Sequence, residues 1–231
     1  MKYEFTGKTQ VKFGVTLRQV RYIATGVIGG WIEKEYNLSQ RGDARVYGNA
    51  LVWGDAMVWG DATVWGDALV WGDAQVYGDA LVWGDAMVWG DARVYGKARV
   101  GGKARVYGDA MVYGDARVYG DAMVGGDAMV GGKARVYGDA QVCGNARVYG
   151  DAMGGGNADL LLVGPIGSRK SFLTVTADAK IKVRFTTGCF SGSLKDLQAK
   201  LKGDYSARTL YGKQYRAAIA LAKICVKAKK S

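Results

Sequence analysis

Residues 78–95 read GDALVWGDAMVWGDARVY and contain three consecutive hexads. In each hexad a Gly is followed by an acidic residue, Ala, a variable residue, Val and an aromatic residue. Hexads of this pattern run from Gly42 to Leu161, which is 120 residues or 20 hexads. A short fixed period is typical of a solenoid, in which each repeat packs against its neighbours.

The alternation within the hexad predicts short β-strands. Ala at position three and Val at position five are two residues apart, so both point to one side of an extended strand. We expect this pair to face the core and positions four and six to face outward. Gly at position one suits a corner, and Asp, Asn or Lys at position two suits a turn. An apolar period of 2 argues against a helical repeat.

An inward aliphatic residue in every hexad resembles the hexapeptide repeat of left-handed parallel β-helices. The resemblance implies a triangular coil of three hexads, or 18 residues, and therefore nearly seven coils. At about 4.8 Å per coil the prism is about 30 Å long. This register stacks Lys97, Lys103 and Lys133 between aspartates, which relieves carboxylate repulsion.

We therefore predict a mainly β protein with three parts. Residues 42–161 form the left-handed β-helix, residues 1–41 form an N-terminal β cap and the lead-in to the repeat, and residues 162–231 form a small α+β module.

Local patterns define the ends of the chain. Residues 11–24 read as strand-like, and residues 171–177 and 180–190 read as two strands. Residues 191–203 predict a helix capped by Ser, and the apolar spacing within residues 206–228 predicts a second helix.

The net charge of +11 is concentrated at the C-terminus. Residues 162–231 hold 15 Lys and Arg against 3 Asp and Glu, a net charge of +12, whereas residues 42–161 carry −5 and residues 1–41 carry +4. A basic module of this kind can bind nucleic acid, an anionic ligand or an acidic partner.

Several classes of protein are disfavoured by what the sequence lacks. There is no signal-peptide pattern and no apolar run of about 18 residues, which favours a cytoplasmic protein without a membrane partner. The three cysteines, Cys143, Cys189 and Cys225, predict free thiols. No histidine is present, so we expect no acyltransferase base, no histidine zinc site, no cofactor and no enzymatic activity.

Tryptophan is concentrated at position six of the early hexads. Two interpretations stay open: the rings form ladders that stack edge to edge and stabilise the sheets, or they form a subunit interface of a homo-oligomer. The residues concerned are Trp53, Trp59, Trp65, Trp71, Trp83 and Trp89.

Arginine and tyrosine dominate the later hexads. The 18-residue register stacks Arg99, Arg117 and Arg135 on one face, with Tyr119 and Tyr137 beside them and Gly101 leaving room next to the two rings. Such a face could bind phosphate and stack a base. The alternative is that each arginine pairs with an aspartate at a corner and stays solvated.

Residues 164–171, GPIGSRKS, partly match a phosphate-binding P-loop. The second glycine of that motif is Arg169 here, and the following SFLTVTAD predicts a strand where a P-loop needs a helix. An anion-binding turn formed by Gly167, Ser168, Arg169 and Lys170 remains a hypothesis.

The ends carry a second resemblance. GGWIE at residues 29–33, NLSQ at residues 37–40, GPIGSR at residues 164–169 and GCFSG at residues 188–192 resemble a family of phage and prophage proteins with these hexad repeats. The resemblance implies a phage origin and a product in the bacterial host cytoplasm, and it supplies no activity or catalytic residues.

Four hypotheses for function follow. The first is an oligomeric, non-enzymatic binding or assembly protein that presents its basic and aromatic surfaces to an anionic ligand or host protein, for example to sequester a nucleotide signal in counter-defence. The others are nucleic-acid binding through the C-terminal module, a structural phage protein, and a divergent acyltransferase that lacks the usual histidine.

Overall fold

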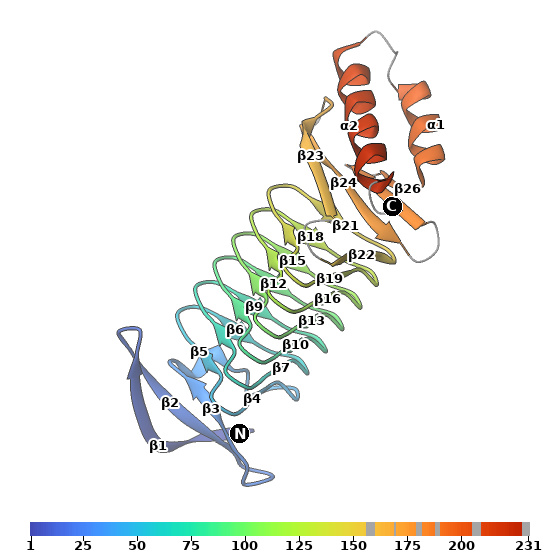
Figure 1. The fold of residues 1–231 in the computed structure, drawn as a ribbon. Helices are drawn as coiled ribbons and strands as arrows, with labels where there is room; N and C mark the ends of the chain where they lie inside the picture. The colour runs from blue at the N-terminus through green and yellow to red at the C-terminus, as the bar shows by residue number, and fades with distance from the viewer. Residues whose placement is uncertain (156–159, 169, 179–181, 188–189, 205–208, 228–231) are drawn as a thin grey trace.

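The structure, a computed structural model, describes residues 1–155, 160–168, 170–178, 182–187, 190–204 and 209–227. It is an elongated β-solenoid with a β-hairpin at its N-terminal end and a small sheet with two helices at its C-terminal end (Figure 1). The predicted mainly β fold of parallel coils with an N-terminal cap and an α+β module is confirmed. Its left-handed winding stays a prediction.

Each hexad from Gly42 to Gly155 folds into one strand of two to four residues and one corner, because the corner glycines adopt a left-handed backbone. Their φ angles lie between +61° and +75° from Gly48 to Gly150, a region that side chains disfavour. At Gly90 (φ +70°) a Cβ atom would also lie 3.0 Å from the backbone nitrogen of Gly108 in the next coil. The corners therefore need glycine both for conformation and for space.

Three parallel sheets surround one core. Sheet A contains β3 (Ile28–Ile32), β5 (Leu51–Val52), β8 (Leu69–Val70), β11 (Met87–Val88), β14 (Arg105–Val106), β17 (Met123–Val124) and β20 (Gln141–Val142). Sheet B contains β6 (Met57–Val58), β9 (Gln75–Val76), β12 (Arg93–Val94), β15 (Met111–Val112), β18 (Met129–Val130) and β21 (Arg147–Val148). Sheet C contains β4 (Arg45–Val46), β7 (Thr63–Val64), β10 (Leu81–Val82), β13 (Arg99–Val100), β16 (Arg117–Val118), β19 (Arg135–Tyr137) and β22 (Ala152–Gly155).

The 18-residue register is confirmed by the strand pairing. Arg99 pairs with Arg117 and Arg117 pairs with Arg135, and the backbone nitrogen of Arg99 donates to the oxygen of Ala116 at 2.8 Å. The Ala and Val residues at positions three and five are buried throughout and form one continuous core. Leu51 departs from the predicted outward orientation of position four, since it is 2% exposed where it pairs with Trp31 of β3.

The N-terminal cap extends sheet A and covers the ends of the other two sheets. β1 (Tyr3–Lys12) and β2 (Val15–Tyr22) form an antiparallel hairpin that pairs with β3, and the short helix η1 (Glu35–Asn37) follows. The stretch 11–24, predicted to be strand-like, contains the hairpin turn at Phe13 and Gly14, both of which have positive φ. The turn places the Phe13 ring on Trp53 at 5.2 Å.

Two tyrosine hydroxyls satisfy backbone groups that have no preceding coil to pair with. The Tyr22 hydroxyl accepts from the nitrogen of Val46 at 2.6 Å and donates to its oxygen at 3.1 Å. The single proton of the Tyr3 hydroxyl is shared between the carbonyl oxygens of Glu35 (2.7 Å) and Leu38 (3.0 Å). Burial raises the pKa of Tyr22 well above its usual value, so its hydroxyl keeps the proton that it donates.

The C-terminal module continues sheet C. β23 (Leu160–Ile166), β24 (Ser171–Asp178), β25 (Lys182–Thr187) and β26 (Phe190–Gly192) form an antiparallel sheet, and β24 also pairs with β22. The boundary predicted between residues 161 and 162 falls inside β23, which pairs with β24 and does not continue the coil. The sequence of residues 156–161 resembles another hexad, and for this reason the predicted end of the solenoid lies beyond β22, the last strand of the coils.

The two helices that the sequence predicts are present, and α1 (Leu194–Asp204) and α2 (Leu210–Lys227) cover one face of this sheet. Ser193 caps α1, since its hydroxyl accepts from the backbone nitrogen of Asp196 at 3.3 Å. Leu173 and Phe185 of the sheet pack with Leu197 and Ile219 of the helices, so the module has a core of its own.

Candidate functional site

The predicted arginine face exists on sheet C. Arg99, Arg117 and Arg135 occupy neighbouring rungs, and all three side chains are exposed. The rungs of a sheet lie about 4.8 Å apart, so three positive charges follow one another along the solenoid axis. We call these residues the arginine ladder.

The corners beside the arginine ladder add further positive charge. Lys97 and Lys133 lie between sheets B and C, and Lys103 lies between sheets C and A. The side chains of these three lysines and three arginines make no hydrogen bond or ion pair with any residue that the structure describes. The expected pairing of each arginine with a corner aspartate is therefore wrong within the described residues, whereas the expectation that these arginines stay solvated is confirmed by their exposure.

The tyrosines of sheet C stack on each other. The rings of Tyr119 and Tyr137 are 5.4 Å apart and within 11° of parallel, and Tyr119 keeps 37% of its surface exposed. Gly101 leaves no room beside them, because the Trp83 ring lies across it and a Cβ there would be 2.1 Å from that ring. The predicted gap for a base is therefore absent at Gly101.

The tryptophan residues form one ladder on each sheet. The rings stack face to face, with neighbouring centroids 4.3 to 5.5 Å apart, and the prediction of edge-to-edge stacking is wrong. Aromatic rings at coil spacing gain most contact when they overlap. Trp53, Trp71 and Trp89 belong to sheet A, Trp59 to sheet B, and Trp65 and Trp83 to sheet C.

Glycines at position six end these ladders, which the sequence did not suggest. Trp83 lies over Gly101, Tyr107 over Gly125 and Tyr113 over Gly131. Because the ring faces contact other rings or glycine backbone, the ladders present mainly ring edges to solvent. A tryptophan-mediated subunit interface stays a prediction, and it would have to use those edges.

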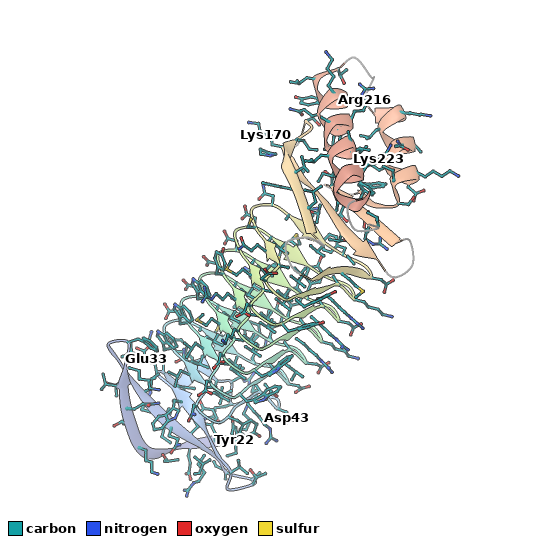
Figure 2. All side chains as sticks on the ribbon, in the orientation of Figure 1. Tyr22, Glu33, Asp43, Lys170, Arg216 and Lys223 are labelled. Atoms are coloured by element: carbon teal, nitrogen blue, oxygen red, sulfur yellow. The ribbon has the colours of Figure 1, made fainter. Side chains whose placement is uncertain are left out.

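The turn at residues 167–170 lies apart from the arginine ladder. It joins β23 to β24, and Figure 2 shows Lys170 at the end of this hairpin that points away from the solenoid. The Gly167 nitrogen donates to Oε1 of Gln214 on α2 at 3.0 Å, so it is already engaged. Ser168 and Lys170 are exposed, Arg169 lies outside the described residues, and β24 follows where a P-loop requires a helix.

The helices of the module stand on the same side of the sheet as the arginine ladder. Residues that pair across neighbouring strands lie on the same face of a sheet. Arg135 pairs with Met153 of β22, and Met153 pairs with position 177 of β24. Val175, two residues before position 177, lies on that same face and pairs with Phe185. Val175 and Phe185 are buried in the core under the helices. The arginine ladder and the helices therefore lie on the same face of the extended sheet C. The helices carry further basic residues, namely Lys195, Lys200, Lys202, Lys213, Arg216 and Lys223.

One open groove lies at the other end of the solenoid. It has a volume of about 560 Å³ between η1 and β6, and its lining includes Tyr36, Gln40, Met57 and Trp59. Sequence reasoning missed this groove, because η1 lies before the first hexad and has no repeat pattern.

Three segments of the solenoid match a family model described as the YdcK Beta solenoid repeat, at residues 104–120, 116–132 and 140–156. These segments, which all lie within residues 104–156, are similar to β-solenoid repeats of the YdcK type. The matched segments contain Arg105, Arg117 and Tyr119. Of the arginine ladder they therefore contain Arg117 alone. None of the curated proteins matches the chain.

The remaining sequence-based expectations concern metals, thiols and membranes. Among the described residues, no group of three or more His, Cys, Asp or Glu side chains is arranged to hold a metal ion. Cys143 is a free, exposed thiol after β20, whereas Cys189 and the side chain of Cys225 lie outside the described part of the chain. No described helix is long and apolar enough to cross a membrane.

Proposed function

We propose that this protein is a non-enzymatic binding protein for a linear polyanion, namely a strand of nucleic acid. The observation that supports the proposal is the arginine ladder, whose three exposed guanidinium groups form no ion pair with described residues. Sheet C continues into a module with a sequence charge of +12, so one side of the molecule offers a long cationic surface.

A long anion fits this surface better than a single nucleotide does. Small-ligand sites are concave and bury most of the ligand, whereas the arginine ladder lies on the outer face of a sheet. A strand with many phosphates can contact several rungs and release counterions at each one. Tyr119 keeps 37% of its surface exposed, so its ring is available to contact a base.

A binding role also agrees with the composition of the chain. An acyltransferase of the hexapeptide type needs a base, and the sequence contains no histidine to serve as one. The resemblance to phage proteins suggests the cytoplasm of an infected bacterium as the setting. If the anion is a single nucleotide and not a strand, the protein would act in counter-defence by sequestering a nucleotide signal.

The test compares two double variants that remove the same charge. Arg99→Gln with Arg117→Gln neutralises two rungs of sheet C. Arg93→Gln with Arg105→Gln neutralises two exposed arginines at the same hexad position on sheets B and A. Fluorescence anisotropy with a labelled single-stranded oligonucleotide at low salt gives the affinity of each.

The proposal predicts that the sheet C variant binds roughly tenfold more weakly than the control variant, because each loses two charges but only one loses phosphate contacts. Equal affinities would show that the arginine ladder is not the site. Absence of binding by the unaltered protein would refute nucleic-acid binding, and heat on titration with cyclic or linear nucleotides would then favour the short anion.

A further inference from the structure

A ladder of negative charge runs along another edge of the solenoid. Its members occupy position two of the hexads that join sheet A to sheet B, and all are exposed: Asp55, Asp73, Asp91, Asp109 and Asp127. Asp55 pairs with Lys34 at 3.1 Å and accepts from Tyr36, whereas the other four carboxylates make no hydrogen bond or ion pair with described residues. We call this edge the aspartate ladder.

The aspartate ladder differs from the other two edges of the prism. Lysine interrupts the aspartates between sheets B and C at Lys97 and Lys133, and those between sheets C and A at Lys103. No lysine interrupts the edge between sheets A and B, which ends at Asn145. The position-two residues of this edge therefore form an unbroken row of five aspartates, which neither of the other edges has.

The two ladders lie on opposite sides of the same coils. In a prism of three sheets around one core, the edge between sheets A and B lies across that core from sheet C. Asp91, Asp109 and Asp127 each precede by eight residues the arginine of their own coil, at positions 99, 117 and 135. Both ladders consequently have the same spacing, about 4.8 Å, and they share three coils.

We propose that the aspartate ladder of one copy docks on the arginine ladder of a second copy, so that the solenoids associate side by side. Equal spacing allows each carboxylate to meet a guanidinium when the two copies lie parallel. Alternative arrangements bring like charges together, because two aspartate edges repel and two arginine faces repel. A nucleic acid strand offers negative charge without this matched spacing.

Each copy would contact one neighbour through its aspartate ladder and another through its arginine ladder. Such a contact is heterologous, and it produces rows of molecules. The charges are exposed, so the association weakens as salt screens them at ionic strengths above about 0.1 M. This partner goes beyond the proposed function, because it is the chain itself and not a polyanion.

The test uses two full-length variants with reversed charge. One carries Asp91→Lys and Asp109→Lys, changes that the fold accepts at other corners, where Lys97 and Lys103 already stand. The other carries Arg99→Glu and Arg117→Glu on exposed positions of sheet C. Analytical ultracentrifugation at low salt measures self-association of each variant alone and of their equimolar mixture, and far-UV circular dichroism checks the fold.

The unaltered protein is expected to associate with rising concentration. Each variant alone is expected to remain monomeric, because its edge and its face then carry the same charge at the two substituted rungs, and the mixture is expected to associate again. An unaltered protein that stays monomeric, a single variant that associates normally, or a mixture that stays monomeric would each overturn the inference. Asp91→Asn with Asp109→Asn provides a milder variant that is expected to lose association as well.

The same variants separate this inference from the proposed function. The variant with Asp91→Lys and Asp109→Lys retains the arginine ladder and is expected to bind the oligonucleotide at least as well as the unaltered protein. Loss of self-association with retained oligonucleotide binding supports docking through the aspartate ladder. If the variant with Asp91→Lys and Asp109→Lys still self-associates, docking through the aspartate ladder is contradicted, whether or not the variant binds the oligonucleotide.

Discussion

At the residue scale, the end of the solenoid depends on single hydroxyl groups. The first rung of sheet C has no preceding coil, and the Tyr22 hydroxyl pairs with both polar backbone atoms of Val46. Tyr22 and Val46 are 2% and 0% exposed, so water does not replace this hydroxyl easily. A buried backbone group without a partner costs more than an ordinary hydrogen bond contributes.

Replacing Tyr22 with Phe is therefore expected to lower the free energy of unfolding by about 1–3 kcal/mol, because it leaves the amide and carbonyl of Val46 buried and unpaired. Chemical denaturation followed by circular dichroism measures the change. Tyr77→Phe is the control: its ring stacks in the sheet B ladder, and its hydroxyl has no described partner. Equal losses in both variants would show that the hydroxyl of Tyr22 does not stabilise the cap.

At the scale of the element, the coil depends on its corner glycines. Gly90→Ala places a Cβ in a left-handed conformation and 3.0 Å from the next coil, which is expected to lower the free energy of unfolding by at least about 1–2 kcal/mol. Gly203→Ala in α1 is the matched control, since its Cβ meets nothing within 4 Å and Ala favours a helix by up to about 0.5–1 kcal/mol. Thermal unfolding should show opposite signs for the two variants, and destabilisation by both would contradict this view of the corners.

The sequence predicts the coils well because every rung repeats one local rule. Alternating Ala and Val specify the core, glycine specifies the corner, and the period of 18 residues places Arg99, Arg117 and Arg135 together. The tilt of Trp83 over Gly101 could not be predicted in this way, because it depends on a side-chain conformation that crosses between coils. The end of the solenoid is also difficult to predict, because the sequence of β23 remains apolar although β23 pairs antiparallel with β24 and is not part of a coil.

The cap and the charge pairing were harder to predict for a different reason. Nothing in the repeat indicates that Tyr22 would bond to Val46, 24 residues away, because that contact replaces the missing coil. Ion pairs between ladder arginines and corner aspartates were a reasonable expectation from spacing alone. Within the described residues they do not form, and the exposed side chains extend into solvent.

At the scale of the whole molecule, the charge is divided between opposite sides of the prism. The arginine ladder and the aspartate ladder run along the same coils and face away from each other. If the arginine ladder binds both a polyanion and a second copy, the two partners compete for it. Their competition links assembly to ligand binding.

A single-stranded oligonucleotide added to self-associated protein at low salt is therefore expected to dissociate the rows into smaller complexes. Sedimentation velocity, with absorbance of the labelled oligonucleotide as a second signal, measures both species together. An uncharged oligonucleotide analogue of the same length is the control and should leave the rows intact. Larger particles that contain both components would instead indicate that the two partners use separate surfaces.

The most direct test of the arginine ladder as a polyanion site is the salt dependence of oligonucleotide binding. For the unaltered protein the logarithm of the association constant should fall linearly with the logarithm of the salt concentration. For Arg99→Gln with Arg117→Gln the slope should be shallower by about 1.4, because each lost phosphate contact removes about 0.7 for a single strand. An unchanged slope would contradict phosphate binding by these two arginines.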